Sequence, residues 1–274
     1  MPVADDTDLH MLDSNPLASF AQLDDIARTC ASSKDLIAKL TLSDEDIHKI
    51  ELNTRGQSSN PHWHRLRRGR ITASNFYRVH TKMQSLKKNP NIDCSKLVHS
   101  LIEPPSLSHL PQIQKGLLLE SDGVKALVDQ LTSEGHKNVT VKESGLYLYK
   151  PMQYIGASPD GVLTCDCCEG EHLIEIKCPS SPISKLSYLV PQSKSLKLKT
   201  AHPYFGQIQG QMLVTGINKT YFFVYTVSGG KHLEEIHMSH SFCKQLVSNL
   251  EVFFTQYLAP SLLSAPSKKK IRLL

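Results

Sequence analysis

A turn with one carboxylate, followed by a strand with a second carboxylate and a lysine, most constrains how this chain can fold. The turn is Ser158-Pro159-Asp160-Gly161, and fourteen residues separate Asp160 from Glu175 in Glu175-Ile176-Lys177. Residues 175 and 177 are two apart on an expected strand, so both side chains project from one face. The intervening residues suffice for two short strands and a loop. The pattern therefore predicts a hairpin that brings two carboxylates and a lysine to one edge of a sheet.

Placing two carboxylates close together is unfavourable in free energy unless a cation compensates their like charges. Oxygen ligands suit Mg²⁺, with Mn²⁺ as a substitute. A bound metal would lower the pKa of its water and stabilise the leaving oxygen, while Lys177 would hold the attacking water. Phosphodiester hydrolysis is the expected chemistry. An ordinary turn aspartate with an exposed Glu–Lys pair would give the same bare pattern by chance.

The surroundings favour the catalytic interpretation. The Glu–Lys pair interrupts an apolar strand, and burying such a pair at a strand end without a partner ion is unfavourable. Glu120, on an expected helix over residues 113–131, can supply a third carboxylate, directly or through water. Gln207 offers a neutral hydrogen-bonding group from an expected helix over 203–216.

The remaining pattern predicts short helices in an acidic segment up to residue 55, with Ser43 as a helix cap. Strands are expected over 139–150, 154–157, 161–164 and 172–177, then a hairpin of 219–227 with 231–238 and a closing helix over 239–258. A polar break at 54–61 divides the chain into a helical extension (1–60), a core domain (61–260) and a basic tail (261–274). The extension is expected to be an accessory helical layer or a mobile arm.

Charge is distributed unevenly along the chain. Residues 61–100 contain nine Lys or Arg against the single Asp93, and residues 178–233 contain six Lys without any Asp or Glu. Two acid-poor segments around a carboxylate-bearing middle suit a polyanion track, although two solvated faces would look the same. The chain contains no membrane-length apolar run and no signal-peptide core, so an intracellular location is expected, nuclear in a eukaryotic host.

Four blocks of the sequence, in this order along the chain, together resemble the lambda-exonuclease or YqaJ-type viral recombinase family of PD-(D/E)xK nucleases. The blocks are residues 63–74 (WHRLRRGRITAS), the Gly116–Glu120 helix, the Asp160 turn with Glu175–Pro179, and the Gln207–Gln209 helix. They span about residues 63–225. The form of the blocks is more similar to versions carried by eukaryotic mobile elements or large viruses, and the acidic segment before Trp63 exceeds what the phage-type enzyme needs.

The resemblance implies a restriction-endonuclease-like α/β core, with a mixed central sheet flanked by helices. It implies Mg²⁺ held by Asp160, Glu175 and the carbonyl of Ile176, with Lys177 and Gln207 supporting the reaction. It also implies 5′→3′ degradation of duplex DNA, a trimer, and a single-strand annealing protein as a partner. Arg67 and Ser74 match the positions that hold the terminal 5′-phosphate, and a helix N-terminus beside an arginine is an anion site. The residues expected to contact DNA are Trp63, Arg65, Arg67, Arg70 and Ser74.

A cysteine group lies in the loop between the two catalytic strands. Cys165, Cys167 and Cys168, with His172 nearby, could bind zinc in principle. Their spacing is tighter than usual, and adjacent Cys167 and Cys168 are not expected to reach one tetrahedral ion together. Free thiols at a hairpin tip are the preferred interpretation.

Three other functions remain open beside the exonuclease. An endonuclease on the same core would cut covalently closed circular DNA, which an exonuclease would not. A catalytically silent DNA-binding module would bind DNA without metal and without turnover. A scaffold acting through the N-terminal helices would depend on residues 1–60, which deletion would test.

Overall fold

The computed structural model describes residues 22–105, 111–192 and 195–264, and only the backbone of residues 111–118. The first part of the acidic segment and residues 265–274 of the predicted basic tail lie outside the described residues. In the described ranges, no helix is both long and apolar enough to cross a lipid bilayer.

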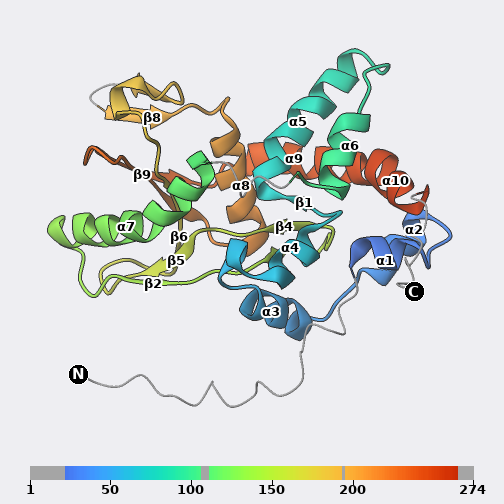
Figure 1. Cartoon of the computed structure of the whole chain (residues 1–274), viewed down its shortest axis with the longest axis horizontal. Helices are drawn as coiled ribbons and strands as arrows, with labels where there is room; N and C mark the ends of the chain where they lie inside the picture. The colour runs from blue at the N-terminus through green and yellow to red at the C-terminus, as the bar shows by residue number, and fades with distance from the viewer. Residues whose placement is uncertain (1–21, 106–110, 193–194, 265–274) are drawn as a thin grey trace.

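Helices make up about half of the described chain and are shown in Figure 1. They are α1 (Leu23–Ala27), α2 (Ser33–Lys39), α3 (Asp44–Asn53), α4 (Pro61–Arg67), α5 (Ala73–Lys88), α6 (Ser95–Ile102), α7 (Pro111–Ser133), α8 (Pro203–Thr215), α9 (His240–Phe253) and α10 (Ala259–Ser264). One π-helical stretch, Phe254–Leu258, joins α9 to α10, and 3-10 helices cover Gln57–Ser59 and Ile183–Lys185.

The strands within the described ranges form three sheets. They are β1 (Ile71–Thr72), β2 (Thr140–Lys142), β3 (Tyr147–Leu148), β4 (Ile155–Ala157), β5 (Gly161–Thr164), β6 (His172–Lys177), β7 (Leu189–Gln192), β8 (Ser195–Leu198), β9 (Lys219–Tyr225) and β10 (Lys231–His237). The largest sheet has the order β10-β9-β6-β5-β2, a smaller one β1-β4-β3, and β7 pairs with β8. In the largest sheet β6 runs parallel to β9 and antiparallel to β5, so the sheet is mixed.

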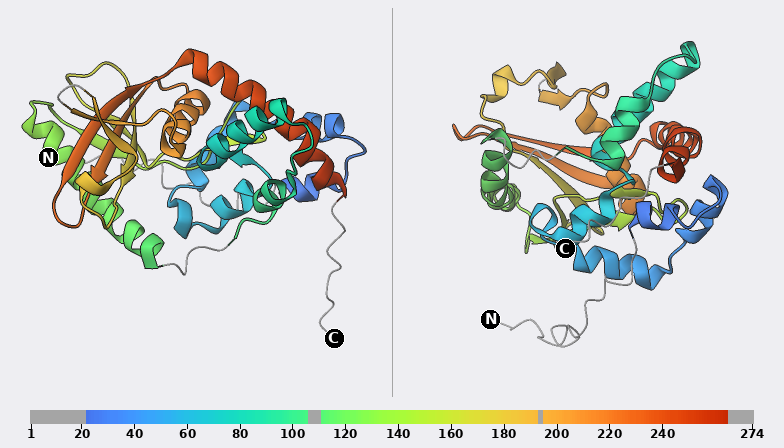
Figure 2. Two further views of the ribbon diagram at one scale, coloured as in Figure 1. Left: turned by 90° about the horizontal axis from the view of Figure 1, so that it is seen from above. Right: turned by 45° about the vertical axis from the view of Figure 1, so that its right-hand side comes forward.

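Two helices cover opposite faces of the five-stranded sheet (Figures 1 and 2). On one face, Leu173 and Phe222 pack with Ile208 and Met212 of α8. On the other face, Ile174 packs with residues of α7 in a separate apolar cluster. This alternation follows the two-residue period of a strand. It places odd-numbered residues of β6, including Glu175, on the face that α8 covers.

Helix α8 approaches α5 through two glycines spaced four apart. A Cβ on Gly206 would lie 2.9 Å from the Cβ of Tyr77, and a Cβ on Gly210 would lie 2.0 Å from Cδ2 of the fully buried Phe76. The glycines therefore let the two helix backbones approach closely. This contact fixes where α8 lies relative to the sheet.

The N-terminal helices belong to the same packed body. Leu23 of α1 and Leu36 of α2 are completely buried, in the cluster that also contains Phe76 and Phe254. Ser43 caps α3 as predicted, accepting a hydrogen bond from the backbone N–H of Asp46 at 3.1 Å. For residues 22–60 this packing favours the accessory layer over the mobile arm, while the division of the chain at residue 60 stays a prediction.

The expected fold class is confirmed: helices flank a mixed central sheet and N-terminal helices precede it. One expected element is divided, since the single strand predicted over residues 139–150 is two short strands, β2 and β3, in different sheets. The reason lies at Gly145, whose N–H donates to Glu51 and where a Cβ would meet the Glu51 carbonyl oxygen at 1.9 Å. The chain changes sheet there because α3 occupies the adjoining space.

The contact between α5 and α8 leads to a stability prediction. Gly210→Ala should lower the free energy of unfolding by about 2 kcal/mol or more, because overpacking a closed core forces neighbours to move. Gly216→Ala, at the end of the same helix, is the control. A Cβ added to Gly216 would meet no neighbouring atom within 4 Å, but the residue has a φ of 76°. Only the left-handed backbone should therefore reduce stability, by about 1 kcal/mol. Chemical denaturation of both variants measures the difference. Equal stability of the two would contradict the proposed packing.

Candidate active site

Asp160 is anchored to the strand that carries the second carboxylate. It directly precedes β5, and Gly161 pairs with Ile174 across the hairpin. The Asp160 N–H donates to the Ile174 carbonyl at 3.1 Å, and its Oδ2 accepts from the Ile176 N–H at 2.6 Å. The hairpin expected from the sequence is thus present, and it brings Asp160 beside Glu175 and Lys177.

Glu175 is completely buried and is surrounded by hydrogen-bond donors. Its Oε1 accepts from Lys177 Nζ and, at 2.7 Å, from Gln207 Nε2. Its Oε2 accepts from Gln211 Nε2, also at 2.7 Å. The predicted contribution of Gln207 to the cluster is therefore matched by a direct contact.

Gln211 was not predicted, although the sequence contains a signal for it. Gln207 and Gln211 are four apart on α8, so they project from the same side of the helix. A search for a polar pair at helical spacing would have found both. Gln57 was also missed: its Nε2 donates to the carbonyl of Pro159 at 2.7 Å and so supports the Asp160 turn from the N-terminal segment.

Glu120 approaches the cluster from α7. One turn further along that helix, Gly123 faces the side chain of Ile176, and the Cys178 thiol donates to the Leu119 carbonyl at 3.5 Å. Burial raises the pKa of Glu120, Lys177 lowers it, and the charge of Glu175 raises it further. The third carboxylate therefore lies within electrostatic reach of the pair on β6.

The electrostatics of the cluster are unbalanced. Burial and the charge of Glu175 raise the pKa of Asp160 well above its usual range. Burial lowers the pKa of Lys177, but Glu175 and Asp160 oppose this and the net pKa is raised. Three carboxylates thus share one ammonium group. Such an arrangement favours the approach of a cation with a charge of two.

A second group of predicted residues lies around Trp63. The Arg67 guanidinium stacks 3.6 Å from the centre of the Trp63 ring, and the indole N–H donates to Ser158 Oγ at 2.9 Å. Arg67 also donates to Thr72 Oγ1 at 3.3 Å and to Ser74 Oγ at 3.4 Å. Burial lowers the pKa of Arg67 to about 10, so it remains charged at neutral pH. The structure therefore brings Trp63, Arg67 and Ser74 together and connects them to the Asp160 turn.

Arg70 does not join this group. Its side chain is buried, and its guanidinium donates to the backbone carbonyls of Leu66 and Gln153. These contacts tie α4 to the segment before β4, which is a structural role. Arg65 lies half-buried on α4.

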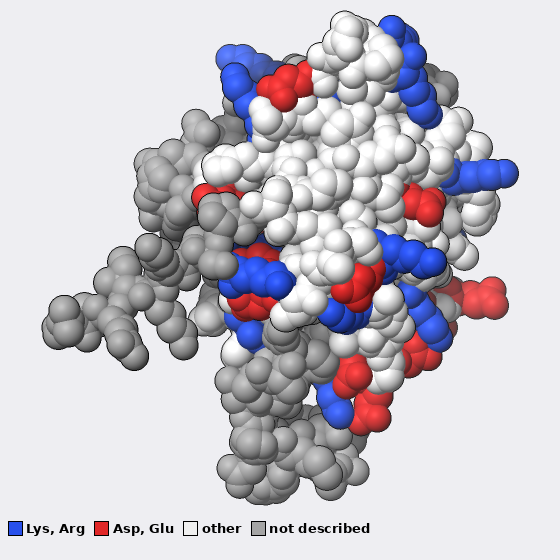
Figure 3. All heavy atoms as spheres, turned by 90° about the vertical axis from the view of Figure 1, so that its right-hand side faces the viewer, with Lys and Arg blue, Asp and Glu red and all other residues white. Residues whose placement is uncertain are grey.

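Figure 3 shows how charged side chains are distributed on one face of the molecule. On the right-hand side of Figure 1, Lys and Arg lie next to Asp and Glu, around a broad area without charged side chains. Among the residues coloured there, no continuous basic surface is present.

The chain matches one family model and several solved structures. The family model for the YqaJ-like viral recombinase domain matches residues 62–218, and no curated protein shows significant sequence similarity. The alkaline exonuclease LHK-Exo from Laribacter hongkongensis has a similar structure, with a TM-score of 0.50, 22% identity, and coverage of 73% of this chain and 93% of that chain.

Two structures of SOX with nucleic acid are also similar. A SOX–DNA complex gives a TM-score of 0.52 with 14% identity over 88% of this chain and 79% of that chain. A SOX–RNA complex from KSHV gives 0.52 with 15% identity over 84% and 79%. At these identities the likeness concerns the fold. The family match covers more than half of the chain and includes both groups of residues described above, so the chain belongs to the YqaJ-like viral recombinase family.

Proposed function

We propose that this chain is a Mg²⁺-dependent DNA exonuclease that degrades duplex DNA from phosphorylated 5′ ends. The observation that supports it best is the convergence of Asp160, Glu175 and Lys177 at one end of the β5–β6 hairpin, where Glu175 is completely buried. A buried carboxylate with an ammonium partner and a second carboxylate beside it suits phosphodiester hydrolysis. Membership of the YqaJ-like family supports the same activity.

The donor set fits a hard divalent cation. Carboxylate and carbonyl oxygens are preferred by Mg²⁺, and Mn²⁺ can replace it. Gln211 also supports a bound cation, because its buried Oε1 has no hydrogen-bond partner among the described residues and could accept a hydrogen bond from a metal-bound water. In the proposal Asp160, Glu175 and the Ile176 carbonyl hold the ion, with Glu120 binding directly or through water. When bound, Mg²⁺ would acidify water and offset charge on the phosphate.

The remaining steps belong to the protein's own side chains. The Lys177 ammonium group contacts Glu175 and lies 5.0 Å from the centre of the Tyr204 ring. These two contacts hold the side chain in one orientation. From there it would orient the water whose oxygen attacks phosphorus and offset the charge that develops on the phosphoryl oxygens. Gln207 and Gln211 hold the Glu175 side chain in place by donating to both of its oxygens.

The group around Arg67 gives the proposed polarity. Ser74 is the second residue of the sixteen-residue α5, so the positive end of that helix faces the same place as the Arg67 guanidinium. Attack of water on phosphorus breaks the bond to the 3′ oxygen of the terminal nucleotide. The next nucleotide then carries a 5′-phosphate. Each cut would therefore recreate the end that Arg67 and Ser74 are proposed to bind.

An endonuclease on the same core remains the second candidate, since the carboxylate cluster would serve either reaction. Covalently closed circular DNA separates the two: cutting of the circle by the wild-type protein would favour the endonuclease.

Asp160→Asn should abolish turnover while DNA binding is retained. The neutral amide removes a ligand from the proposed metal, and a loss of at least about a hundredfold in rate is expected. A linear duplex labelled at one 5′ end, incubated with and without Mg²⁺, measures the release of mononucleotide. Asp129→Asn, exposed on α7, is the matched control and should keep full activity. Unchanged cutting by Asp160→Asn would refute the metal role.

Arg67→Ala should remove a preference for 5′-phosphorylated ends. Hydrogen bonds to a charged group contribute about 1.5 to 3 kcal/mol, so the wild type should prefer phosphorylated over hydroxyl ends by about tenfold or more. Initial rates on matched duplexes with either end test this. Arg78→Ala on the exposed side of α5 is the control. If Arg67→Ala keeps the full preference, the phosphate site lies elsewhere while the nuclease proposal stands.

A further inference from the structure

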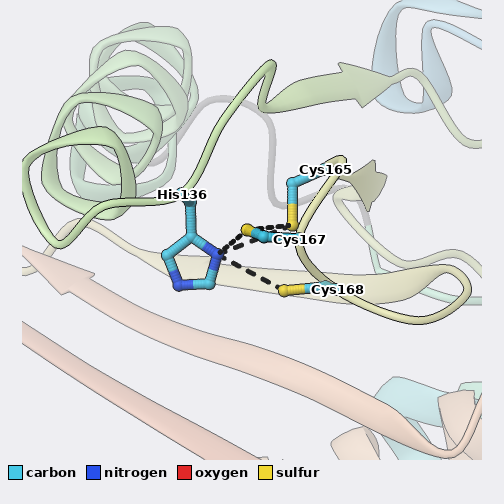
Figure 4. Close-up of side chains that lie close together, drawn as sticks. All are labelled: His136, Cys165, Cys167 and Cys168. Atoms are coloured by element: carbon cyan, nitrogen blue, oxygen red, sulfur yellow. Dashed lines mark hydrogen bonds between the residues drawn. The ribbon is translucent and has the colours of Figure 1, made fainter.

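A second cluster of metal-binding side chains lies at the other end of the β5–β6 hairpin from Asp160 (Figure 4). Cys165 directly follows β5, and Cys167 and Cys168 lie in the loop that leads to β6. His136 comes from the segment between α7 and β2, and all four ligand atoms lie within 4.8 Å of one another. Two segments that are distant in sequence thus meet at one point.

Four of the six distances between the ligand atoms are close to those of a tetrahedral site. Nδ1 of His136 lies 3.5 Å from the Cys165 sulfur and 3.3 Å from the sulfurs of both Cys167 and Cys168. The sulfurs of Cys165 and Cys167 are 3.6 Å apart. Bonds of about 2.3 Å to sulfur and 2.0 Å to nitrogen place tetrahedral ligands roughly 3.5 Å (N to S) and 3.8 Å (S to S) apart.

We propose that Cys165, Cys167, Cys168 and His136 form a structural Zn²⁺ site. Three thiolates and one imidazole are a known ligand set of closed zinc sites, with no position left for a substrate. Binding would release the thiol protons to solvent and leave one net negative charge on the site. The site is distinct from the carboxylate cluster and does not depend on the proposed nuclease activity.

The structure departs from the sequence-based view of this loop in two respects. His172 is not in the cluster: it is buried and its ring stacks on Tyr221, with 5.3 Å between centroids. Adjacent Cys167 and Cys168, which were not expected to reach one tetrahedral ion easily, have their sulfurs equally close to His136 Nδ1, at 3.3 Å each. A turn, in which the Cys168 N–H donates to the Cys165 carbonyl at 3.4 Å, brings both sulfurs to the same nitrogen.

Hydrogen bonds outside the four ligands hold the two segments together. The Asp166 N–H donates to the Lys137 carbonyl at 3.0 Å, and Asn138 Nδ2 donates to Asp166 Oδ2 at 2.6 Å. The His136 N–H donates to the Leu131 carbonyl at 3.0 Å, so the histidine extends directly from the end of α7. The ligands are therefore placed by the surrounding backbone.

Other uses of the cysteines fit less well. All seven cysteines of the chain are free thiols, four of them outside this cluster, and a disulfide would not require an imidazole against all three sulfurs. An iron–sulfur cluster holds its ligands at several iron atoms, which requires wider spacing than 4.8 Å. A single ion matches the observed spacing.

The site would fix α7 to the hairpin. Helix α7 carries Glu120, and the opposite end of the β5–β6 hairpin carries Asp160 and Glu175. A tie between the end of α7 and the hairpin tip restricts sliding of the helix along the sheet. The four ligands act through the fold and would not contact substrate.

The test measures metal in the full chain, purified without a polyhistidine tag. Elemental analysis should find zinc equimolar with protein in the wild type. Cys167→Ser and His136→Asn should lower the affinity for Zn²⁺ by at least about tenfold, as measured by competition with a chromogenic chelator. Cys30→Ser, a half-buried thiol on another face, and Asp160→Asn at the carboxylate cluster are controls that should keep the zinc.

Cobalt provides a readout that needs no variant. Replacing the metal with Co²⁺ should give thiolate-to-cobalt charge-transfer absorption and the intense visible bands of a tetrahedral site. An absence of zinc together with an octahedral cobalt spectrum would overturn the proposal. So would loss of zinc in Asp160→Asn but not in Cys167→Ser, or iron–sulfur absorption in the purified protein.

Discussion

The carboxylate of Glu175 is the group on which the rest of the structure depends. Taking an ionised side chain completely out of water costs several kcal/mol unless donors replace the lost hydration. Lys177, Gln207 and Gln211 supply these donors. Two of the three come from α8, so the helix has to lie against this part of the sheet. The glycines that let α8 approach α5 are therefore as much a part of the site as its polar groups.

The same hairpin presents two kinds of donor at its two ends. The carboxylates of Asp160 and Glu175 lie where β5 begins and β6 ends, and the thiols of Cys165, Cys167 and Cys168 lie at the loop between them. Hard and soft ligands favour different ions, so each end would select its own metal from a mixture. Their separation along the strands would keep tightly binding thiolates away from the carboxylates, where the proposed reaction would use an exchangeable, hydrated ion.

Sequence reasoning located the groups whose positions follow from local periodicity. Asp160, Glu175 and Lys177 converge because a two-residue period and a short return loop leave little freedom. It did not predict that Arg70 is buried against backbone carbonyls. Four arginines lie within six residues, and their spacing does not indicate which side chain points into the protein. Sequence reasoning chose His172 over His136 for the cysteine cluster by proximity in the chain. Only the path of α7 brings His136 to the loop, and that is a tertiary contact.

The register of the β5–β6 hairpin has a consequence for how related chains vary. Gly161 pairs with Ile174 beside the carboxylates, while the loop over 165–171 lies at the far end. Residues inserted or deleted in that loop would leave the pairing beside Asp160 and Glu175 unchanged. The fourteen-residue interval between the two carboxylates is thus a property of the loop rather than of the chemistry. Relatives can carry the same site at other intervals, and a search pattern with a fixed gap would overlook them.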